Sequence, residues 1–146
     1  MQSDAEVLQL ETGDEAGVTV VRAIGDIDLS TTPDLREMME RIIATPAPSE
    51  TLPRHIVLDM REVPFIDSAG LALLVEVRKR FYSSCRLALL IASATQPERV
   101  LKLGRFDTFL TIGYSFDELR SAGVGREQSS SSSAQSTAPV SAMAPA

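Results

Sequence analysis

Two adjacent polar side chains, Asp67 and Ser68, lie where the sequence predicts the start of a helix. Pro64 ends the preceding strand, because proline has no backbone N–H to donate a hydrogen bond to a sheet. Apolar residues at helical spacing follow Ser68. A helix N-terminus favours added negative charge, so a serine hydroxyl there would accept a phosphate well. An Asp or Ser in this position also serves as an ordinary N-cap, and spacing alone favours the cap.

The two residues after Ser68 favour a functional interpretation. Neither Ala69 nor Gly70 is needed for capping, and Gly within a first helical turn costs roughly 0.5–1 kcal/mol relative to Ala. Small neighbours leave the Ser68 hydroxyl open to another protein. We therefore consider Ser68 a candidate phosphorylation site, and modification there need not unfold the domain.

A serine hydrolase would need a general base close to Ser68, usually a histidine. The single histidine, His55, precedes the strand whose other end leads to Ser68. A strand of about five residues separates its two ends by roughly 16 Å. A nucleophile elbow would also place Gly where this chain has Ile66. We predict no catalytic residue, and we expect His55 to be a surface residue at a strand start.

Four carboxylates are predicted near strand ends and could together hold a hard cation: Asp26, Asp28, Asp59 and Asp67. The related alternative is a receiver domain phosphorylated on Asp59. Receivers open with a parallel β-α-β pattern, whereas this chain is predicted to open with a hairpin. Asp26 and Asp28 suit a turn and Asp67 suits a cap, so we expect no metal site. No GxxxxGK[ST] loop occurs, so we expect no nucleotide or other cofactor.

The elements around these residues alternate as in an α/β domain. Two opening strands form a hairpin, and two buried strands around the helix after Ser68 form a right-handed βαβ unit. We predict strands at 7–11 and 18–24 joined by residues 12–17, a helix from about Pro33 to Ala44, and a proline-rich loop at 45–53. A buried strand ending at 58–60, a strand at 87–92, a helix at 96–103, an edge strand at 109–112 and a helix at 115–119 follow.

Length and composition narrow the function. The 146 residues suit one domain; we expect residues 1–6 to be flexible, 7–120 to form the domain, and the Ser/Ala/Pro-rich residues 121–146 to be disordered. A net charge of −6 argues against direct nucleic-acid binding. The single cysteine, Cys85, excludes an internal disulfide framework. Without a leader pattern or a segment of membrane-spanning length, we expect no membrane partner and a cytoplasmic location.

Two motifs carry a resemblance to a known family. Residues 65–70 (FIDSAG), after a strand that ends in Leu-Asp-Met at 58–60, resemble the phosphorylation motif of bacterial anti-sigma factor antagonists, the STAS domains. Residues 25–28 (GDID) resemble that family's second motif. The resemblance covers roughly residues 7–119, and Ala69 stands where the pattern often has a second Ser.

The resemblance implies a STAS-like α/β fold: a mixed sheet opened by an antiparallel strand pair, with helices packed against it. It implies a non-enzymatic protein that, when unphosphorylated, binds an ATP-binding anti-sigma factor and so frees a sigma factor. That partner, a serine kinase, would phosphorylate Ser68 and end the interaction, and a serine phosphatase would reverse it. The expected partner-binding residues are Asp28, Ile66, Asp67, Ala69 and Gly70. The alternative is a constitutive docking subunit of a transport or stress-signalling complex, without a phosphate cycle.

Overall fold

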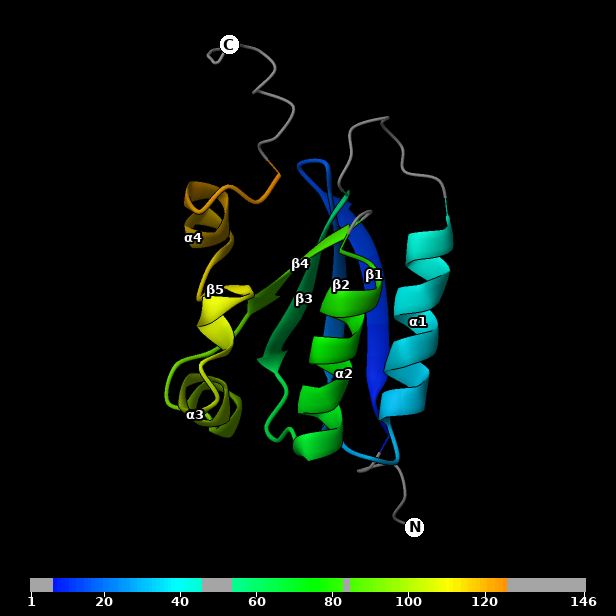
Figure 1. The fold of residues 1–146 in the computed structure, drawn as a ribbon, viewed down its shortest axis with the longest axis vertical. Helices are drawn as coiled ribbons and strands as arrows, with labels where there is room; N and C mark the ends of the chain where they lie inside the picture. Colours follow the sequence, from blue (N-terminus) through cyan, green and yellow to red (C-terminus); the bar gives the residue numbers. More distant parts are fainter. Residues whose placement is uncertain (1–6, 46–53, 83–84, 126–146) are drawn as a thin grey trace.

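A five-stranded sheet forms the centre of the molecule in the computed structural model, which describes residues 7–45, 54–82 and 85–125 (Figure 1). The strands lie in the order β1-β2-β3-β4-β5. The first pair is antiparallel and the others are parallel. The bounds are β1 Gln9–Glu15, β2 Val18–Ile24, α1 Thr32–Ala44, β3 Arg54–Glu62, α2 Ser68–Arg80, β4 Cys85–Leu90, α3 Gln96–Leu103, a 3-10 turn Phe106–Thr108, β5 Thr111–Gly113 and α4 Phe116–Ser121. The predicted mixed α/β fold is confirmed.

The hairpin between β1 and β2 is tighter than the sequence predicted. Ala16 (φ 53°) and Gly17 (φ 83°) form its turn. Two left-handed residues are typical of a two-residue type I′ connection, which matches the twist of the strands. β1 therefore continues to Glu15, and the predicted connection over 12–17 was too long. Polar residues in this stretch resembled a loop because β1 is an edge strand exposed along most of its length.

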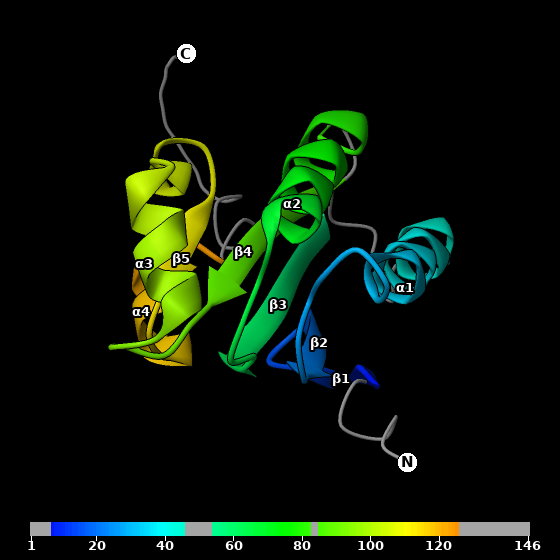
Figure 2. The same ribbon diagram turned by 90° about the horizontal axis from the view of Figure 1, so that it is seen from below.

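Helices α1 and α2 lie on the same face of the sheet, as Figure 2 shows. On that face the main core includes Leu58 of β3, Leu35 of α1 and Leu73 of α2. The alternate residue Val57 of β3 belongs to a second cluster with Leu119 of α4. β3 is thus buried on both faces, as its continuous apolar sequence predicted.

The last elements agree with the sequence in kind, and the bounds of β5 and α4 differ from the prediction by one or two residues at each end. α3 has its predicted bounds, and the Ser115 hydroxyl caps α4 by accepting from Glu118 N. β5 begins at Thr111, two residues later than predicted. Leu110 N donates to Phe106 O at 2.9 Å, so the backbone before Thr111 is committed to the 3-10 turn rather than to the sheet.

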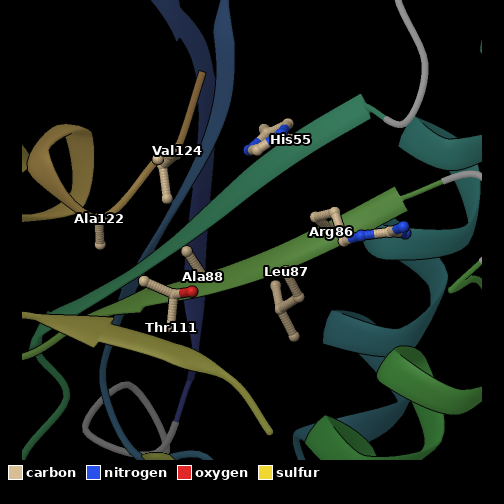
Figure 3. A pocket seen from close by; sticks show the side chains of 8 residues that line it. His55, Arg86, Leu87, Ala88, Thr111, Ala122 and Val124 are labelled. Atoms are coloured by element: carbon tan, nitrogen blue, oxygen red, sulfur yellow. The ribbon is translucent and has the colours of Figure 1, made fainter. Parts of the chain in front are cut away.

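Packed structure continues past the predicted domain end at residue 120. α4 includes Ser121, Val124 is 6% exposed in the second cluster, and Gly125 N donates to His55 Nδ1 at 3.1 Å. Figure 3 shows His55 and Val124 beside a cavity of about 210 Å³ between this segment and strands β3 and β4. Residues 121–125, which the sequence assigned to the tail, therefore pack against the domain. The predictions for residues 1–6, most of the loop at 45–53, and 126–146 lie outside the described residues.

Candidate functional site

Asp67 is the N-cap of α2, and Ser68 is the first residue of that helix. The Asp67 backbone is extended (φ −103°, ψ −172°), and its Oδ1 accepts from Gly70 N at 3.0 Å. The cap that spacing predicted is therefore present and is supplied by Asp67 alone. Ser68 is exposed, and within the described part of the chain its hydroxyl makes no hydrogen bond. The hydroxyl is therefore open to chemistry without loss of the cap.

The turn after β2 lies directly beside the start of α2. Ile27 and Ile66 form a parallel bridge: Ile27 N donates to Phe65 O at 3.0 Å and Asp67 N donates to Ile27 O at 3.1 Å. The Asp67 side chain adds a third link, because its Oδ2 accepts from Leu29 N at 3.1 Å. The two motifs that the sequence separates by about forty residues thus form one surface.

Asp28 organises the turn before α1. Its Oδ1 accepts from Ser30 Oγ at 2.8 Å, from Ser30 N at 3.0 Å and from Thr31 N at 3.1 Å. These bonds, chiefly that of the Ser30 hydroxyl, hold the pKa of Asp28 below its usual range. Asp28 therefore stays charged at neutral pH and gives the turn a rigid shape.

The predicted partner-binding residues divide into a surface set and a supporting set. Asp28, Asp67 and Ala69 are partly exposed beside Ser68. Ile66 is 1% exposed and Gly70 is buried. Ile66 and Gly70 therefore lie beneath the surface that Asp28, Asp67 and Ala69 help to form, and they support it from within the fold.

Two exposed apolar side chains beside Ser68 were missed. Leu29 is 75% exposed and Phe65 is 43% exposed. The sequence offered one signal for Leu29: it is an apolar residue between two polar residues of a turn, Asp28 and Ser30, where exposure is expected. Phe65 directly follows Pro64 and opens the motif at residues 65–70, but it was not included among the predicted partner-binding residues.

α3 holds the segment before Ser68 from the other side. Gln96 Oε1 accepts from Ile66 N and Gln96 Nε2 donates to Ile66 O, both at 2.9 Å. The side-chain amide satisfies both backbone groups of Ile66, as a neighbouring strand would. Bonds from the turn after β2 and from α3 therefore restrain the approach to Ser68 on both sides.

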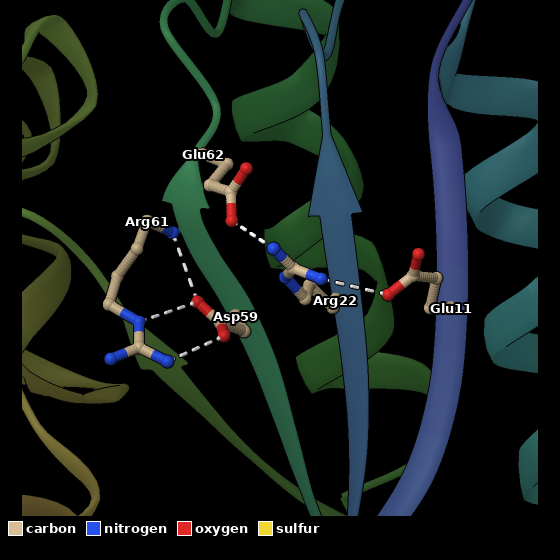
Figure 4. A network of polar contacts seen from close by, with 5 residues as sticks. All are labelled: Glu11, Arg22, Asp59, Arg61 and Glu62. Atoms are coloured by element: carbon tan, nitrogen blue, oxygen red, sulfur yellow. Dashed lines mark hydrogen bonds and ion pairs between the residues drawn. The ribbon is translucent and has the colours of Figure 1, made fainter.

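The remaining carboxylate, Asp59, has a structural partner. It is 4% exposed and accepts from Arg61 Nε at 3.1 Å and from a second guanidinium nitrogen at 3.0 Å (Figure 4). In the same view Arg22 bridges Glu11 and Glu62. The described ranges contain no group of three or more His, Cys, Asp or Glu side chains placed to hold a metal ion. Asp59 is thus buried and paired rather than open as a receiver-type acceptor.

Comparison with known proteins identifies the family. The STAS domain model matches residues 9–119, so the chain belongs to the STAS domain family. An anti-sigma factor antagonist from Mycobacterium paratuberculosis is similar in structure, with a TM-score of 0.67 at 22% identity over 80% of this chain and 93% of that one. The Bacillus cell fate determinant SpoIIAA in its phosphorylated form is also similar, with a TM-score of 0.53 at 17% identity over 80% of this chain and 99% of that one.

Part of a larger protein shares the fold as well. The murine anion transporter Slc26a9 gives a TM-score of 0.56 at 15% identity, over 82% of this chain and 23% of the transporter. At these identities each likeness shows the fold alone. Among the described residues of this chain, no helix has the length and apolar character needed to cross a membrane.

Proposed function

We propose that this protein is an anti-sigma factor antagonist whose binding surface is switched by phosphorylation of Ser68. One observation carries the proposal: Ser68 is exposed at the first position of α2, while Asp67 supplies the cap. The hydroxyl is therefore not needed for folding. Membership of the STAS family and the fold shared with an anti-sigma factor antagonist support the role.

The local electrostatics suit a switch that acts on binding and not on folding. A phosphate adds about −1.5 to −2 charges, which a helix N-terminus accommodates. The same charge lies beside the carboxylate of Asp67, and Asp28 lies in the adjoining turn, on a surface that a partner must desolvate. A partner that binds the acidic, unphosphorylated surface in a defined geometry would lose affinity when a bulky dianion is added.

The partner in this proposal is an anti-sigma factor that is also a serine kinase and binds the ATP. This chain supplies only the acceptor hydroxyl and the docking surface, so we propose no enzymatic activity for it. A serine phosphatase returns the protein to its binding form. The cycle takes place in the cytoplasm, where the sigma factor and its polymerase act.

The first test is phosphopeptide mapping by mass spectrometry of the protein from its own cells, with Ser68→Ala as the control. The proposal expects phosphate on Ser68 and none at that site in the variant. An unmodified Ser68 across growth and stress conditions would reject the switch.

A second test separates charge from shape. The affinity of a purified anti-sigma factor for wild type, Ser68→Ala, Ser68→Asn and Ser68→Asp would be compared. Asn and Asp have nearly the same size, so weaker binding of Ser68→Asp than of Ser68→Asn isolates the effect of the charge. Equal affinities for these two variants would reject the electrostatic account.

The second candidate function is a constitutive docking subunit. It is favoured by the fold shared with a segment of murine Slc26a9, a transporter of which this chain covers 23%. That function needs no phosphate on Ser68. A stable complex whose composition is the same for Ser68→Ala and Ser68→Asp would support it.

A further inference from the structure

Leu29 is held in an exposed position by a rigid polar turn. Its side chain is 75% exposed, yet the backbone around it makes many hydrogen bonds. Asp28 Oδ1 accepts from the backbone N–H groups of Ser30 and Thr31 and from the Ser30 hydroxyl, and Thr31 Oγ1 donates to Asp26 O at 2.9 Å. A large apolar side chain exposed to water gains nothing for folding, but because the backbone that carries it is already held in place, a partner that covers Leu29 does not have to order the turn.

Asp67 links Leu29 to the switch residue. Its Oδ1 caps α2 through Gly70 N, and its Oδ2 accepts from Leu29 N across the two motifs. The carboxylate adjacent to Ser68 therefore sets the position of the Leu29 backbone. Phe65, 43% exposed, joins the same bridge through its carbonyl oxygen, which accepts from Ile27 N.

We infer that Leu29 is the main apolar anchor of the docking surface and that Asp67 is the residue that positions it. The inference rests on the proposed function and specifies the partner's chemistry: an apolar pocket for Leu29, with uncharged hydrogen-bond donors at its rim. The donors follow from the carboxylates around the anchor, those of Asp28 and Asp67, which must stay hydrogen-bonded when water is excluded. A basic rim would attract a phosphate on Ser68 instead of releasing the partner.

The first experiment truncates the anchor. The purified ATP-binding anti-sigma factors of the source organism serve as probes, and affinity is measured by titration calorimetry. Leu29→Ala should bind about tenfold more weakly or worse, as for a buried anchor. Tyr82→Ala is the matched control: Tyr82 is 47% exposed at the other end of α2, roughly 20 Å away at 1.5 Å per helical residue. Its affinity should stay within about twofold of wild type.

The second experiment tests the role of Asp67. Asp67→Asn keeps a good capping side chain, but Gly70 N and Leu29 N donate to different carboxylate oxygens, and the amide puts an NH2 donor in place of one of them, so one of the two bonds is lost. It should weaken binding in the wild-type background and change it by less than about twofold in the Leu29→Ala background. If Asp67 were only a structural cap, Asp67→Asn would lower the thermal midpoint of unfolding and leave the affinity for the partner unchanged. The lowering would be the same with Leu29 or Ala at position 29.

Three outcomes overturn these statements separately. If the wild-type protein binds an anti-sigma factor and Leu29→Ala binds it with an affinity within about twofold of wild type, Leu29 is not the anchor. An equal loss for Asp67→Asn in both backgrounds would refute positioning and indicate that Asp67 contacts the partner directly. A wild-type protein that binds none of the anti-sigma factors would refute the proposed function itself, and the inference with it.

Discussion

The substitution Gly70→Ala tests how closely the two motifs are packed. Gly70 is buried in the first turn of α2, above the bridge between Ile27 and Ile66. A methyl group added to Gly70 would lie 2.5 Å from Ile66 Cγ1 and 2.9 Å from Ile27 Cγ2. Both atoms belong to branched side chains buried at 1% exposure or less, so neither can move aside without a shift of the bridge.

Two opposing energies set the size of the effect. Ala is favoured over Gly in a helix by about 0.8–1 kcal/mol. Forcing an extra carbon into a packed site costs about 1–3 kcal/mol. A separation of 2.5 Å is well below contact distance, so we place the packing cost in the upper half of that range and expect a net destabilisation of about 1–2 kcal/mol.

Urea unfolding followed by far-UV circular dichroism measures this difference, read as a lower midpoint with an unchanged m value. Gly13→Ala in β1 is the control, because a methyl group there meets no atom within 4 Å. It should be neutral or more stable by up to about 1 kcal/mol. If Gly70→Ala were as stable as wild type, the close packing beneath Ser68 would be refuted.

Three further predictions concern the rest of the fold. Arg61→Met leaves the carboxylate of Asp59, 4% exposed, without its bidentate partner and should lower the free energy of unfolding in urea by about 1–3 kcal/mol. Arg22→Met removes two ion pairs, but with exposed carboxylates, and should cost less. Burial raises the pKa of the Cys85 thiol from 9.0 to about 11. The contribution of Cys85 to the free energy of unfolding is therefore complete below pH 9 and is lost as the pH rises towards 11. A thiol reagent should also react slowly with the native protein. Val124→Ala should lower stability by about 1–2 kcal/mol, because Val124 is 6% exposed.

Each of these predictions has a contradicting result. A larger loss for Arg22→Met than for Arg61→Met would reverse the ranking by burial. A Cys85→Ser variant that loses the same stability as wild type between pH 9 and 11 would assign that loss to other groups. Unchanged stability of Val124→Ala would mean that the segment after α4 does not contribute to the core.

The elements that the sequence predicted well have local causes. α3 was predicted at its observed bounds because Pro97 and Gly104 mark its two ends, and in the structure the Thr95 side chain adds an N-cap. The cap at Asp67 follows equally from neighbouring residues. The errors occurred where a tertiary neighbour decided the outcome: residues 12–15 are polar but pair with β2, and Val124 lies in a polar stretch but fills the second cluster.

The sequence by itself determined the order of the elements, the hydroxyl of Ser68 at a helix start and the resemblance of its two motifs to the STAS family. Period, capping and turn chemistry are properties of adjacent residues, so they can be read along the chain. Only the tertiary structure decided that Ile66 and Gly70 lie beneath the surface, that Leu29 and Phe65 lie on it, and that Asp67 serves both motifs. Burial and long-range hydrogen bonds depend on which elements pack together, and a sheet with β2 beside β3 was needed to bring residues 27–29 against 65–67.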